Sequence, residues 1–425
     1  MGDVVDKIFQ LSKSREKEDF LHILFGDHVR SVTDGTIPIV LFGAGDVGKD
    51  LCEVLHLHGV YPKYFCDNST SNIGNSYNDV PVISFNELKE KCRDHLILIA
   101  SCKYATEIRQ QLMDHAFPAD KLISVAPIHH PELLRYYRHC QYYTKKPHHV
   151  LSEQDLRNHA EDLSRAYNLL ADQKSRDIFI ARLSLFTTKI DFLGFSKYVA
   201  EYSEINEEAR GSYPFYVSPE DYGYFNNDVF ALKQGEVLVD VGAYNGLSAA
   251  TFAETCKRKN LMYKKIYCFE PDDGNFIMLQ KLAEQVPDIM CINRGLWSES
   301  TTLTFLSNGE CDPGAVLEAC SETSKNRTSA HKIEIQTTSI DEQFPDEEIT
   351  LIKMDIEGAE MEAIQGAANV IKRCRPKLAI SAYHKRNDIY TLPLLINGVA
   401  PHYSFYLRQY GYTLFDMVLF AIPQA

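Results

Sequence analysis

The sequence contains the same pattern twice: an apolar segment of strand length that runs directly into a glycine-rich turn. Residues 37–48 read IPIVLFGAGDVG, and residues 236–246 read EVLVDVGAYNG. A helix-like stretch follows each turn, and then comes a second apolar run that ends in an acid, Asp67 in one copy and Glu270 in the other. Strands that alternate with helices form parallel sheets covered by helices on both faces. The pattern therefore predicts the α/β fold class, with two doubly wound domains in tandem.

Changes in pattern divide the chain into four predicted parts. Residues 1–34 are expected to form a helical lead-in, and residues 35–130 a small Rossmann-like domain. Residues 131–212 carry apolar positions at helical spacing and predict a helical linker, which either packs the two domains together or binds a partner. Residues 213–425 are expected to form the second Rossmann-like domain. Its last segment, YLRQYGYTLFDMVLFAIP, predicts an antiparallel hairpin that closes the sheet.

The charge balance limits the partners of the protein. The 425 residues include 44 Lys and Arg and 58 Asp and Glu, which gives a net charge of −14. An acidic chain binds nucleic acid and anionic membranes poorly, because both require a basic surface. The uncharged run between Asp388 and Arg408 contains Pro393 and Pro401, which argues against a lipid-facing helix. We therefore expect no nucleic-acid partner and no membrane span.

The amino terminus and the cysteines indicate the compartment. The first ten residues, MGDVVDKIFQ, show no basic region followed by an apolar stretch, which a secretory signal would have. The 11 cysteines include no CxxC pair, and this usage is typical of a reduced protein without a disulfide framework. Both observations predict a cytoplasmic protein.

The second glycine-rich turn, from Asp240 to Gly246, carries the most specific signal. It reads D-x-G-x-x-x-G, in which Gly242 lets a ligand approach the backbone and Gly246 lets the next helix pack closely. This spacing differs from the G-x-G-x-x-G dinucleotide fingerprint, and an acid at the end of the strand would repel a pyrophosphate. Glu270 can accept hydrogen bonds from both hydroxyl groups of a ribose. A ligand with a ribose and a positively charged amine but no phosphate is S-adenosylmethionine (SAM).

Four segments of the C-terminal half are similar to the FkbM-type methyltransferases. They are residues 222–246, 268–271 (CFEP), 351–360 (LIKMDIEGAE) and 377–385 (KLAISAYHK). The most specific of them is Asp-x-Glu-Gly-x-Glu after an apolar strand. The resemblance implies a class I, SAM-dependent methyltransferase fold, which transfers a methyl group to a hydroxyl group on sugars or natural products.

The resemblance also implies which residues hold the cofactor. The glycine-rich turn would hold its methionine end, Glu270 would bind the ribose, and residues 293–297 would flank the adenine. Simple packing is the alternative for Trp297, the single tryptophan of the chain. The implied cofactor-binding residues are Asp240, Gly242, Ala243, Tyr244, Asn245, Gly246, Glu270, Pro271, Asn293, Leu296 and Trp297.

Methyl transfer to a hydroxyl group needs a group that removes or polarises the hydroxyl proton. Asp355 ends one buried strand and His384 follows the next, so both are expected at the edge where α/β sheets bind ligands. We predict that His384 is the general base and that Asp355 orients the substrate or the base, with Glu357 and Glu360 as further catalytic candidates. A competing version makes Asp355, Glu360 and His384 the ligands of a divalent metal ion. Each candidate also has a structural alternative. Glu357 and Glu360 could be acids that interact favourably with a helix dipole, and His384 could be a histidine packed at the end of a strand.

A polar insertion at about 301–340 precedes Asp355. Thr302 to Phe305 and Lys332 to Thr337 alternate as strands do, so they predict a hairpin. The loop between them would either cover the acceptor or be a plain surface loop.

The first glycine-rich turn has the sequence context of a dinucleotide site. Gly43, Gly45 and Gly48 follow a strand and open a helix, and Asp67 ends the next strand. The domain is short for a full dinucleotide fold, and it looks like the small Rossmann-type domains that are joined to sugar-modifying enzymes. Three roles stay open: a nucleotide or nucleotide-sugar site, a purely structural or docking module, and NAD-dependent hydride transfer.

Together these observations predict a SAM-dependent O-methyltransferase that acts on a hydroxyl group of a saccharide or a sugar-containing precursor, as in polysaccharide biosynthesis. One alternative is a nucleotide-sugar-binding scaffold with an inactive methyltransferase domain. Another is an NAD-dependent sugar oxidoreductase. The expected partner is a small-molecule or saccharide substrate, and a homo-oligomer is left open.

Overall fold

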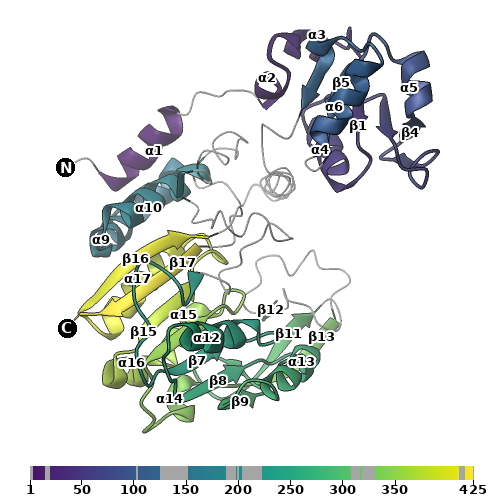
Figure 1. The fold of residues 1–425 in the computed structure, drawn as a ribbon. Helices are drawn as coiled ribbons and strands as arrows, with labels where there is room; N and C mark the ends of the chain where they lie inside the picture. Colours follow the sequence, from purple (N-terminus) through teal and green to yellow (C-terminus); the bar gives the residue numbers. More distant parts are fainter. Residues whose placement is uncertain are drawn as a thin grey trace. The chain divides into compact units, whose positions relative to one another are not determined.

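The computed structural model describes most of the chain in two compact units (Figure 1). One unit comprises residues 8–153 and 182–201, and the other comprises residues 1–7, 154–181 and 202–425. The four-part division expected from the sequence stays a prediction. The described residues are 3–14, 20–101, 104–124, 152–187, 198, 201–202, 223–307, 316–317, 331–410 and 417–424.

The N-terminal unit contains a six-stranded sheet in the order β3-β4-β2-β1-β5-β6. Only β3 runs antiparallel to its neighbour, and the five parallel strands follow the order 3-2-1-4-5, which is a doubly wound arrangement. Its strands are β1 (Ile39–Phe42), β2 (Tyr64–Asp67), β3 (Ser76–Tyr77), β4 (Val80–Ser84), β5 (Leu96–Ile99) and β6 (Leu122–Ser124).

Helices cover both faces of this first sheet. In β1, Ile39 and Leu41 belong to one buried apolar cluster, whereas Val40 and Phe42 belong to another. Because successive side chains of a strand point to opposite faces, this alternation shows an apolar core on each side. The helices are α2 (Phe20–Phe25), α3 (Val29–Thr33), α4 (Asp46–Leu57), α5 (Phe85–Lys91) and α6 (Ala105–Asp114), and α1 (Val4–Ser14) precedes them.

The C-terminal unit contains a seven-stranded sheet in the order β16-β17-β15-β14-β7-β8-β9. The strands from β9 to β15 are parallel, and β17 and β16 close the sheet as an antiparallel hairpin, which confirms the predicted fold class. The strands are β7 (Val237–Val241), β8 (Lys265–Phe269), β9 (Ile289–Ile292), β14 (Leu351–Met354), β15 (Lys377–Ser381), β16 (Tyr403–Gln409) and β17 (Met417–Pro423).

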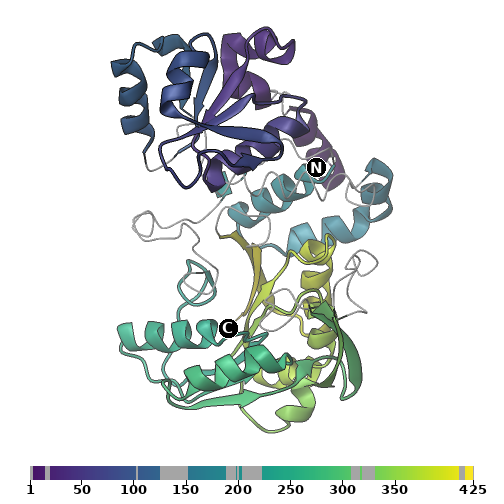
Figure 2. The same cartoon turned by 90° about the vertical axis from the view of Figure 1, so that its right-hand side faces the viewer.

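Helices lie on both sides of this second sheet (Figure 2). The strand order reverses between β7 and β14, so the connections that follow these two parallel strands run in opposite directions along the sheet, one toward β8 and the other toward β15. Such a switch point is where open α/β sheets bind their ligands. The helices are α12 (Leu247–Arg258), α13 (Asp273–Ala283), α14 (Ile340–Gln343), α15 (Glu360–Gln365), α16 (Ala368–Cys374) and α17 (Asp388–Val399).

A small second sheet of this unit contains the predicted hairpin. β11 (Thr302–Ser307) pairs antiparallel with β13 (His331–Thr338), as the alternating sequence indicated. β10 (Gly295–Leu296) and β12 (Val316–Leu317) flank the pair. The remaining loop residues of the insertion, 308–315 and 318–330, lie outside the described residues.

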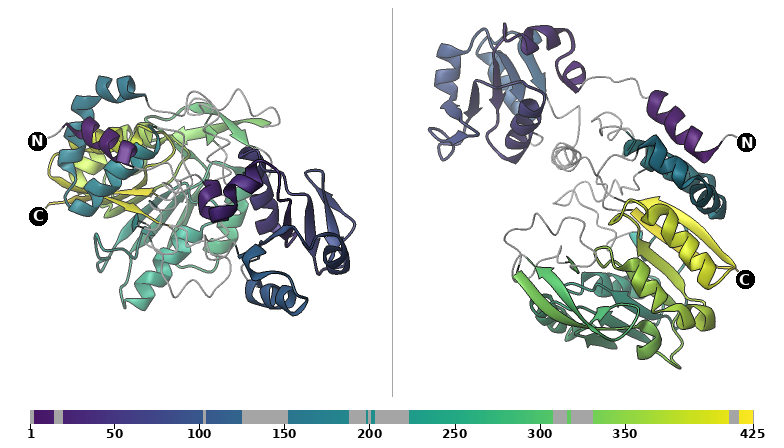
Figure 3. Two further views of the ribbon diagram at one scale, coloured as in Figure 1. Left: turned by 90° about the horizontal axis from the view of Figure 1, so that it is seen from above. Right: turned by 180° about the vertical axis from the view of Figure 1, so that it is seen from behind.

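Helices between the two sheets in sequence pack on the closing hairpin. They are α9 (Ala160–Leu169) and α10 (Gln173–Leu185), and α8 (Glu153–Asn158) precedes them. The N–H of Ala171 donates a hydrogen bond to the carbonyl of Phe405 in β16 at 2.8 Å. Figure 3 shows the teal helices beside the yellow hairpin. None of the helices within the described part of the chain is long and apolar enough to cross a membrane.

Candidate active site

The turn after β7 is shaped by its glycines. Gly242 and Gly246 have φ angles of 73° and 87°, in the left-handed region that favours glycine. The N–H groups of Gly242 and Ala243 both donate to the carbonyl of Phe269, at 3.1 and 3.0 Å. A Cβ atom on Gly242 would lie 1.9 Å from the carbonyl oxygen of Asp355. The predicted cofactor turn therefore touches the loop that carries the predicted catalytic acids.

Glu270 borders this turn from the end of β8 and is only 5% exposed. Its Oε2 accepts the N–H of Tyr244 at 2.9 Å, and its Oε1 accepts the N–H of Asp272 at 2.9 Å. Burial raises the pKa of Glu270 to about 7, although both N–H groups favour the charged form. Its carboxylate is thus held rigidly beside the glycine-rich turn, where two hydroxyl groups of a ribose would find acceptors.

Asp240 makes its contacts inside the protein. It is completely buried, with Lys353 Nζ 3.1 Å from its Oδ1, and its Oδ2 accepts the Ser248 hydroxyl at 2.5 Å. Lys353 also donates to the carbonyl of Gly242 at 2.9 Å. The acid therefore fixes the turn through a buried lysine. Lys353 was not among the predicted site residues, although a lysine within the apolar strand LIKM was a visible signal.

The other predicted cofactor residues have several local roles. Asn245 accepts the N–H of Leu247 at 3.1 Å at the start of α12. Asn293 is exposed and donates to Asp273 at 2.8 Å, whereas Leu296 is 3% exposed. Pro271 and Tyr244 are half-buried.

Trp297 lies against the loop after β14. Its ring packs with a small apolar cluster that contains Ile335 and Ala359, together with Ile356. Its backbone N–H donates to the carbonyl of Thr338 at 2.9 Å. These contacts give Trp297 a packing role. They also attach the small sheet of β10 to β13 to the loop that carries Asp355.

The four predicted catalytic residues come together and form an acid–histidine cluster: Asp355, Glu357, Glu360 and His384. Nδ1 of His384 lies 2.9 Å from Oε1 of Glu360. Its Nε2 lies 3.4 Å from Asp355 and 3.8 Å from Glu357. Asp355 and His384 follow the parallel neighbours β14 and β15, and Glu360 is the first residue of α15.

The electrostatics of the cluster couple its members. Burial acts to lower the pKa of His384, but the carboxylates of Glu360, Glu357 and Asp355 outweigh it and raise that pKa to about 10. Burial acts to raise the pKa of Glu360, but the neighbouring His384 charge and hydrogen bond leave it below its ordinary value. With His384 protonated and Glu360 ionised, the two side chains form a buried ion pair.

Two tyrosines that the sequence analysis did not select hold Asp355. The hydroxyl of Tyr383 donates to its carboxylate at 3.1 Å, and the hydroxyl of Tyr224 does so at 3.4 Å. Tyr224 also shares a hydrogen bond of 2.7 Å with Ser381. A signal existed in the sequence, since both tyrosines lie in segments that resemble the FkbM family.

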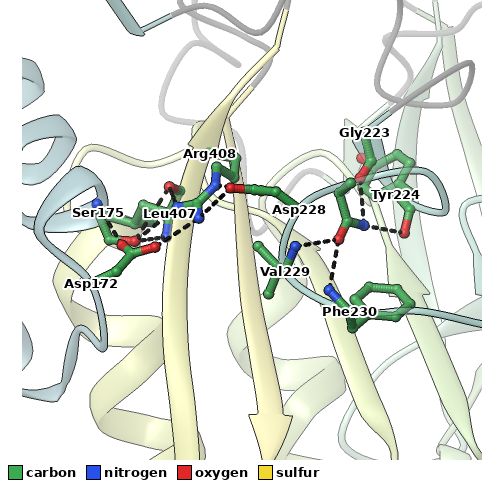
Figure 4. A network of polar contacts seen from close by, with 10 residues as sticks. Asp172, Ser175, Gly223, Tyr224, Asp228, Val229, Phe230, Leu407 and Arg408 are labelled. Carbon is green, nitrogen blue, oxygen red and sulfur yellow. Dashed lines mark hydrogen bonds and ion pairs between the residues drawn. The ribbon is translucent and has the colours of Figure 1, made fainter.

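A polar network positions Tyr224 (Figure 4). The side chain of Asn227 accepts the N–H groups of Val229 and Phe230 at 2.9 and 3.0 Å and donates to the carbonyl of Tyr224 at 3.3 Å. The next residue, Asp228, receives two hydrogen bonds of 2.8 Å from the guanidinium of Arg408. Arg408 is 2% exposed and also donates to Asp172 at 2.7 Å. The segment that carries Tyr224 is thus tied to β16 and to the start of α10.

The first glycine-rich turn has a related geometry in the N-terminal unit. Asp67 accepts the N–H of Ala44 at 2.8 Å. A Cβ atom on Gly43 would lie 2.7 Å from the carbonyl oxygen of Ala100, and one on Gly48 would lie 1.9 Å from that of Gly43. These two glycines are therefore required by packing. A Cβ atom on Gly45 would meet nothing within 4 Å.

Comparisons with known proteins agree with this geometry. Residues 240–414 match the family described as "Methyltransferase FkbM domain", and residues 37–123 match the one described as "C2185-like, N-terminal". No curated protein gives a match.

Among solved structures, the chain is similar to Methyltransferase FkbM from Methylobacillus flagellatus KT. The TM-score is 0.59 at 20% identity, over 98% of this chain and 99% of that one, and this likeness concerns the fold. An rRNA methylase from Streptococcus thermophilus matches with a TM-score of 0.28 at 14% identity, over 46% of this chain and 90% of that one. With the family match and the site geometry, residues 240–414 are a SAM-dependent methyltransferase domain of the FkbM family.

Proposed function

We propose that the C-terminal unit transfers the methyl group of SAM to a hydroxyl group of a saccharide or a sugar-containing precursor. The observation that carries the proposal is the direct contact between the two halves of the site. Gly242 in the cofactor turn leaves no room for a Cβ atom next to Asp355. A methyl donor held by the turn and Glu270 would therefore face an acceptor held by the acid–histidine cluster.

The reaction forms a carbon–oxygen bond and breaks the carbon–sulfur bond of the sulfonium, whose electron pair leaves with the thioether. The hydroxyl proton must also be removed, since a neutral hydroxyl is a weak nucleophile. Two versions of this activation use the same residues. Either His384 is a general base that Asp355 orients, which requires it first to lose the proton that its raised pKa of about 10 retains at neutral pH, or these side chains bind a divalent cation that acidifies the hydroxyl group.

We assign roles on the contacts of each side chain. Glu270 binds the ribose, because its carboxylate borders the turn. Asp240 is a positioning residue that acts through Lys353, because it has no exposed surface. Asp355 and His384 face the acceptor hydroxyl, and Glu360 holds His384. Carboxylate and tyrosine side chains around Asp355 suit an acceptor that is rich in hydroxyl groups.

The test is a calorimetric titration with S-adenosylhomocysteine, followed by a screen for methyl transfer from labelled SAM to free sugars and nucleotide-sugars. We expect binding in the wild type, at least a tenfold loss in Glu270→Ala, and methylation of a hydroxyl group in at least one sugar. No binding of S-adenosylhomocysteine would overturn the cofactor assignment. Binding without transfer to any saccharide would favour the scaffold alternative.

For the N-terminal unit we propose a nucleotide or nucleotide-sugar site at the first glycine-rich turn. The open space beside Gly45 supports it, because packing alone does not require glycine there. Titration with UDP-sugars and NAD, in the wild type and in Gly45→Val, tests this role. Binding that the valine abolishes would support the site, and no binding of either ligand would leave the structural role.

A further inference from the structure

His384 presents its two ring nitrogens to different surroundings. Its side chain is 8% exposed, and Nδ1 is engaged by Oε1 of Glu360. Within the described residues, Nε2 of His384 and Oε2 of Glu360 are buried polar atoms without a hydrogen-bond partner. A buried polar atom without a partner costs about 1–3 kcal/mol, so two in one cluster require an explanation.

The distances around Nε2 fit a cation. Ligand atoms of Asp355, Glu360 and His384 all lie within 4.8 Å of one another, which shows how compact the cluster is, and Glu357 adds a further carboxylate on the Nε2 side. Nε2 itself lies 3.4 Å from an oxygen of Asp355 and 3.8 Å from one of Glu357. Nitrogen and oxygen ligands bind divalent cations at about 2.0–2.2 Å, which places neighbouring ligand atoms about 3–3.5 Å apart. Asp355 already lies at such a separation from Nε2, and a small movement would bring Glu357 to it.

We propose that the acid–histidine cluster is a divalent-cation site, in which Nε2 of His384 and the carboxylates of Asp355 and Glu357 are the ligands. Glu360 is the positioning residue: it accepts the Nδ1 proton and thereby directs the lone pair of Nε2 toward the cation. Metal-binding histidines almost always donate their other ring N–H to a carboxylate, a backbone carbonyl or water, and Glu360 fills this role here. One imidazole with carboxylates suits Mn²⁺ better than Mg²⁺, which prefers oxygen ligands alone. Glu357, with 36% of its side chain exposed, lies on the solvent side.

The place of the site gives the cation a role, and this role rests on the proposed function. The loop of Asp355 abuts the cofactor turn at Gly242. A cation held there would polarise a bound hydroxyl group and lower its pKa, which is the activation that methyl transfer to oxygen requires. Asp355 and His384 would hold that hydroxyl group on the side of the cluster that faces the cofactor turn. Cation binding itself does not depend on methyl transfer and can be measured alone.

Mn²⁺ is the probe for the full-length protein after treatment with a chelator. We expect one Mn²⁺ per chain by electron paramagnetic resonance, with a pulsed-resonance signal from an imidazole nitrogen. His384→Ala and Asp355→Asn should abolish the bound signal, and Glu357→Gln should weaken it. Glu360→Ala should weaken binding about 10–100-fold, while Glu360→Gln, which keeps an acceptor for Nδ1, should restore part of it.

Glu348→Gln, an exposed change outside the cluster, is the matched control and should bind Mn²⁺ like the wild type. Absence of Mn²⁺ binding in the wild type, absence of the nitrogen signal, or unchanged binding in His384→Ala would overturn the site. If His384→Ala fails to fold, Mn²⁺ binding by Glu357→Gln becomes the deciding measurement, because this side chain is partly exposed. Unchanged Mn²⁺ binding by Glu357→Gln would exclude Glu357 as a ligand and overturn the proposed ligand set. Titration with S-adenosylhomocysteine on the same samples separates a failed cation site from a failed cofactor site.

Discussion

The backbone N–H of Tyr244 donates a hydrogen bond to Oε2 of Glu270 across 2.9 Å, which joins the turn after β7 to the end of β8. Ala44 and Asp67 repeat this relationship in the N-terminal unit at 2.8 Å. In both units, an acid at the end of the second strand satisfies an N–H of the glycine-rich turn after the first. The acid therefore shapes the turn before any ligand binds.

Binding of S-adenosylhomocysteine should depend on pH through Glu270. Its pKa is raised to about 7 by burial, and ribose hydroxyl groups bind the ionised carboxylate better. We expect the affinity to fall as the pH decreases below about 7 and to level off above it. Calorimetry from pH 5.5 to 8.5 measures this, and Glu270→Gln should bind weakly with a flat profile. An equally steep profile in Glu270→Gln would assign the dependence to another group.

The same pKa shift affects stability with a defined sign. Since the folded-state pKa of Glu270 lies above its ordinary value of 4.5, ionisation is disfavoured in the folded chain. The favourable contribution is complete below pH 4.5 and is lost as the pH rises through about 7, by about 3.5 kcal/mol at 1.4 kcal/mol per unit. Denaturant unfolding at pH 5.5 and 8.5 should therefore show a larger loss in the wild type than in Glu270→Gln. Equal losses would contradict the shift.

Gly242→Ala should destabilise the C-terminal unit by about 3 kcal/mol and abolish cofactor binding. The new Cβ atom would meet the carbonyl of Asp355 at 1.9 Å, at a backbone φ of 73°. Gly398→Ala in α17 is the control, because nothing lies within 4 Å of its Cβ position. We expect that control to raise the free energy of unfolding by about 0.5–1 kcal/mol. Normal unfolding and binding in Gly242→Ala would contradict the contact between the two loops.

Asp240→Asn should lower the free energy of unfolding by about 3 kcal/mol, since it removes the buried carboxylate that lies 3.1 Å from the Lys353 ammonium. Ser248→Ala removes one hydrogen bond from the same carboxylate and should cost about 1 kcal/mol. Thermal unfolding and titration with S-adenosylhomocysteine should both show the loss in Asp240→Asn. Weak binding at wild-type stability would indicate instead that Asp240 contacts the cofactor.

Arg408→Met should destabilise the C-terminal unit by about 2 kcal/mol. Removal of a buried cation leaves Asp172 and Asp228 without their partner, and the partial exposure of both acids reduces the usual cost. Arg157→Met provides a surface control, because Arg157 pairs with Asp6 at 3.1 Å in an exposed setting. We expect less than about 1 kcal/mol there. Similar losses in both variants, by denaturant unfolding, would contradict the role of Arg408 as a clamp.

Local signals in the sequence predicted several strands of the sheets in both units. Strands of continuous apolar residues followed by glycine turns predicted β1 and β7, and the alternating segments around the insertion predicted β11 and β13. The closing hairpin followed from two aromatic-rich strands at the end of the chain. These features depend on side-chain periodicity and backbone conformation, which neighbouring residues determine.

The strand pattern also predicted that Asp355 and His384 would lie at one edge of a sheet, because parallel neighbours end at the same edge. Three contacts could not be predicted and are seen only in the folded chain: the Glu360 contact with Nδ1 of His384, the ion pair of Lys353 with Asp240, and the hydrogen bond from Tyr224 to Asp355 across 131 positions of sequence. Such contacts depend on strand order and packing between distant segments, and no local pattern encodes them. A hydrogen bond or ion pair acts over only a few ångströms, so the partner of a carboxylate is known only once packing has brought distant segments together.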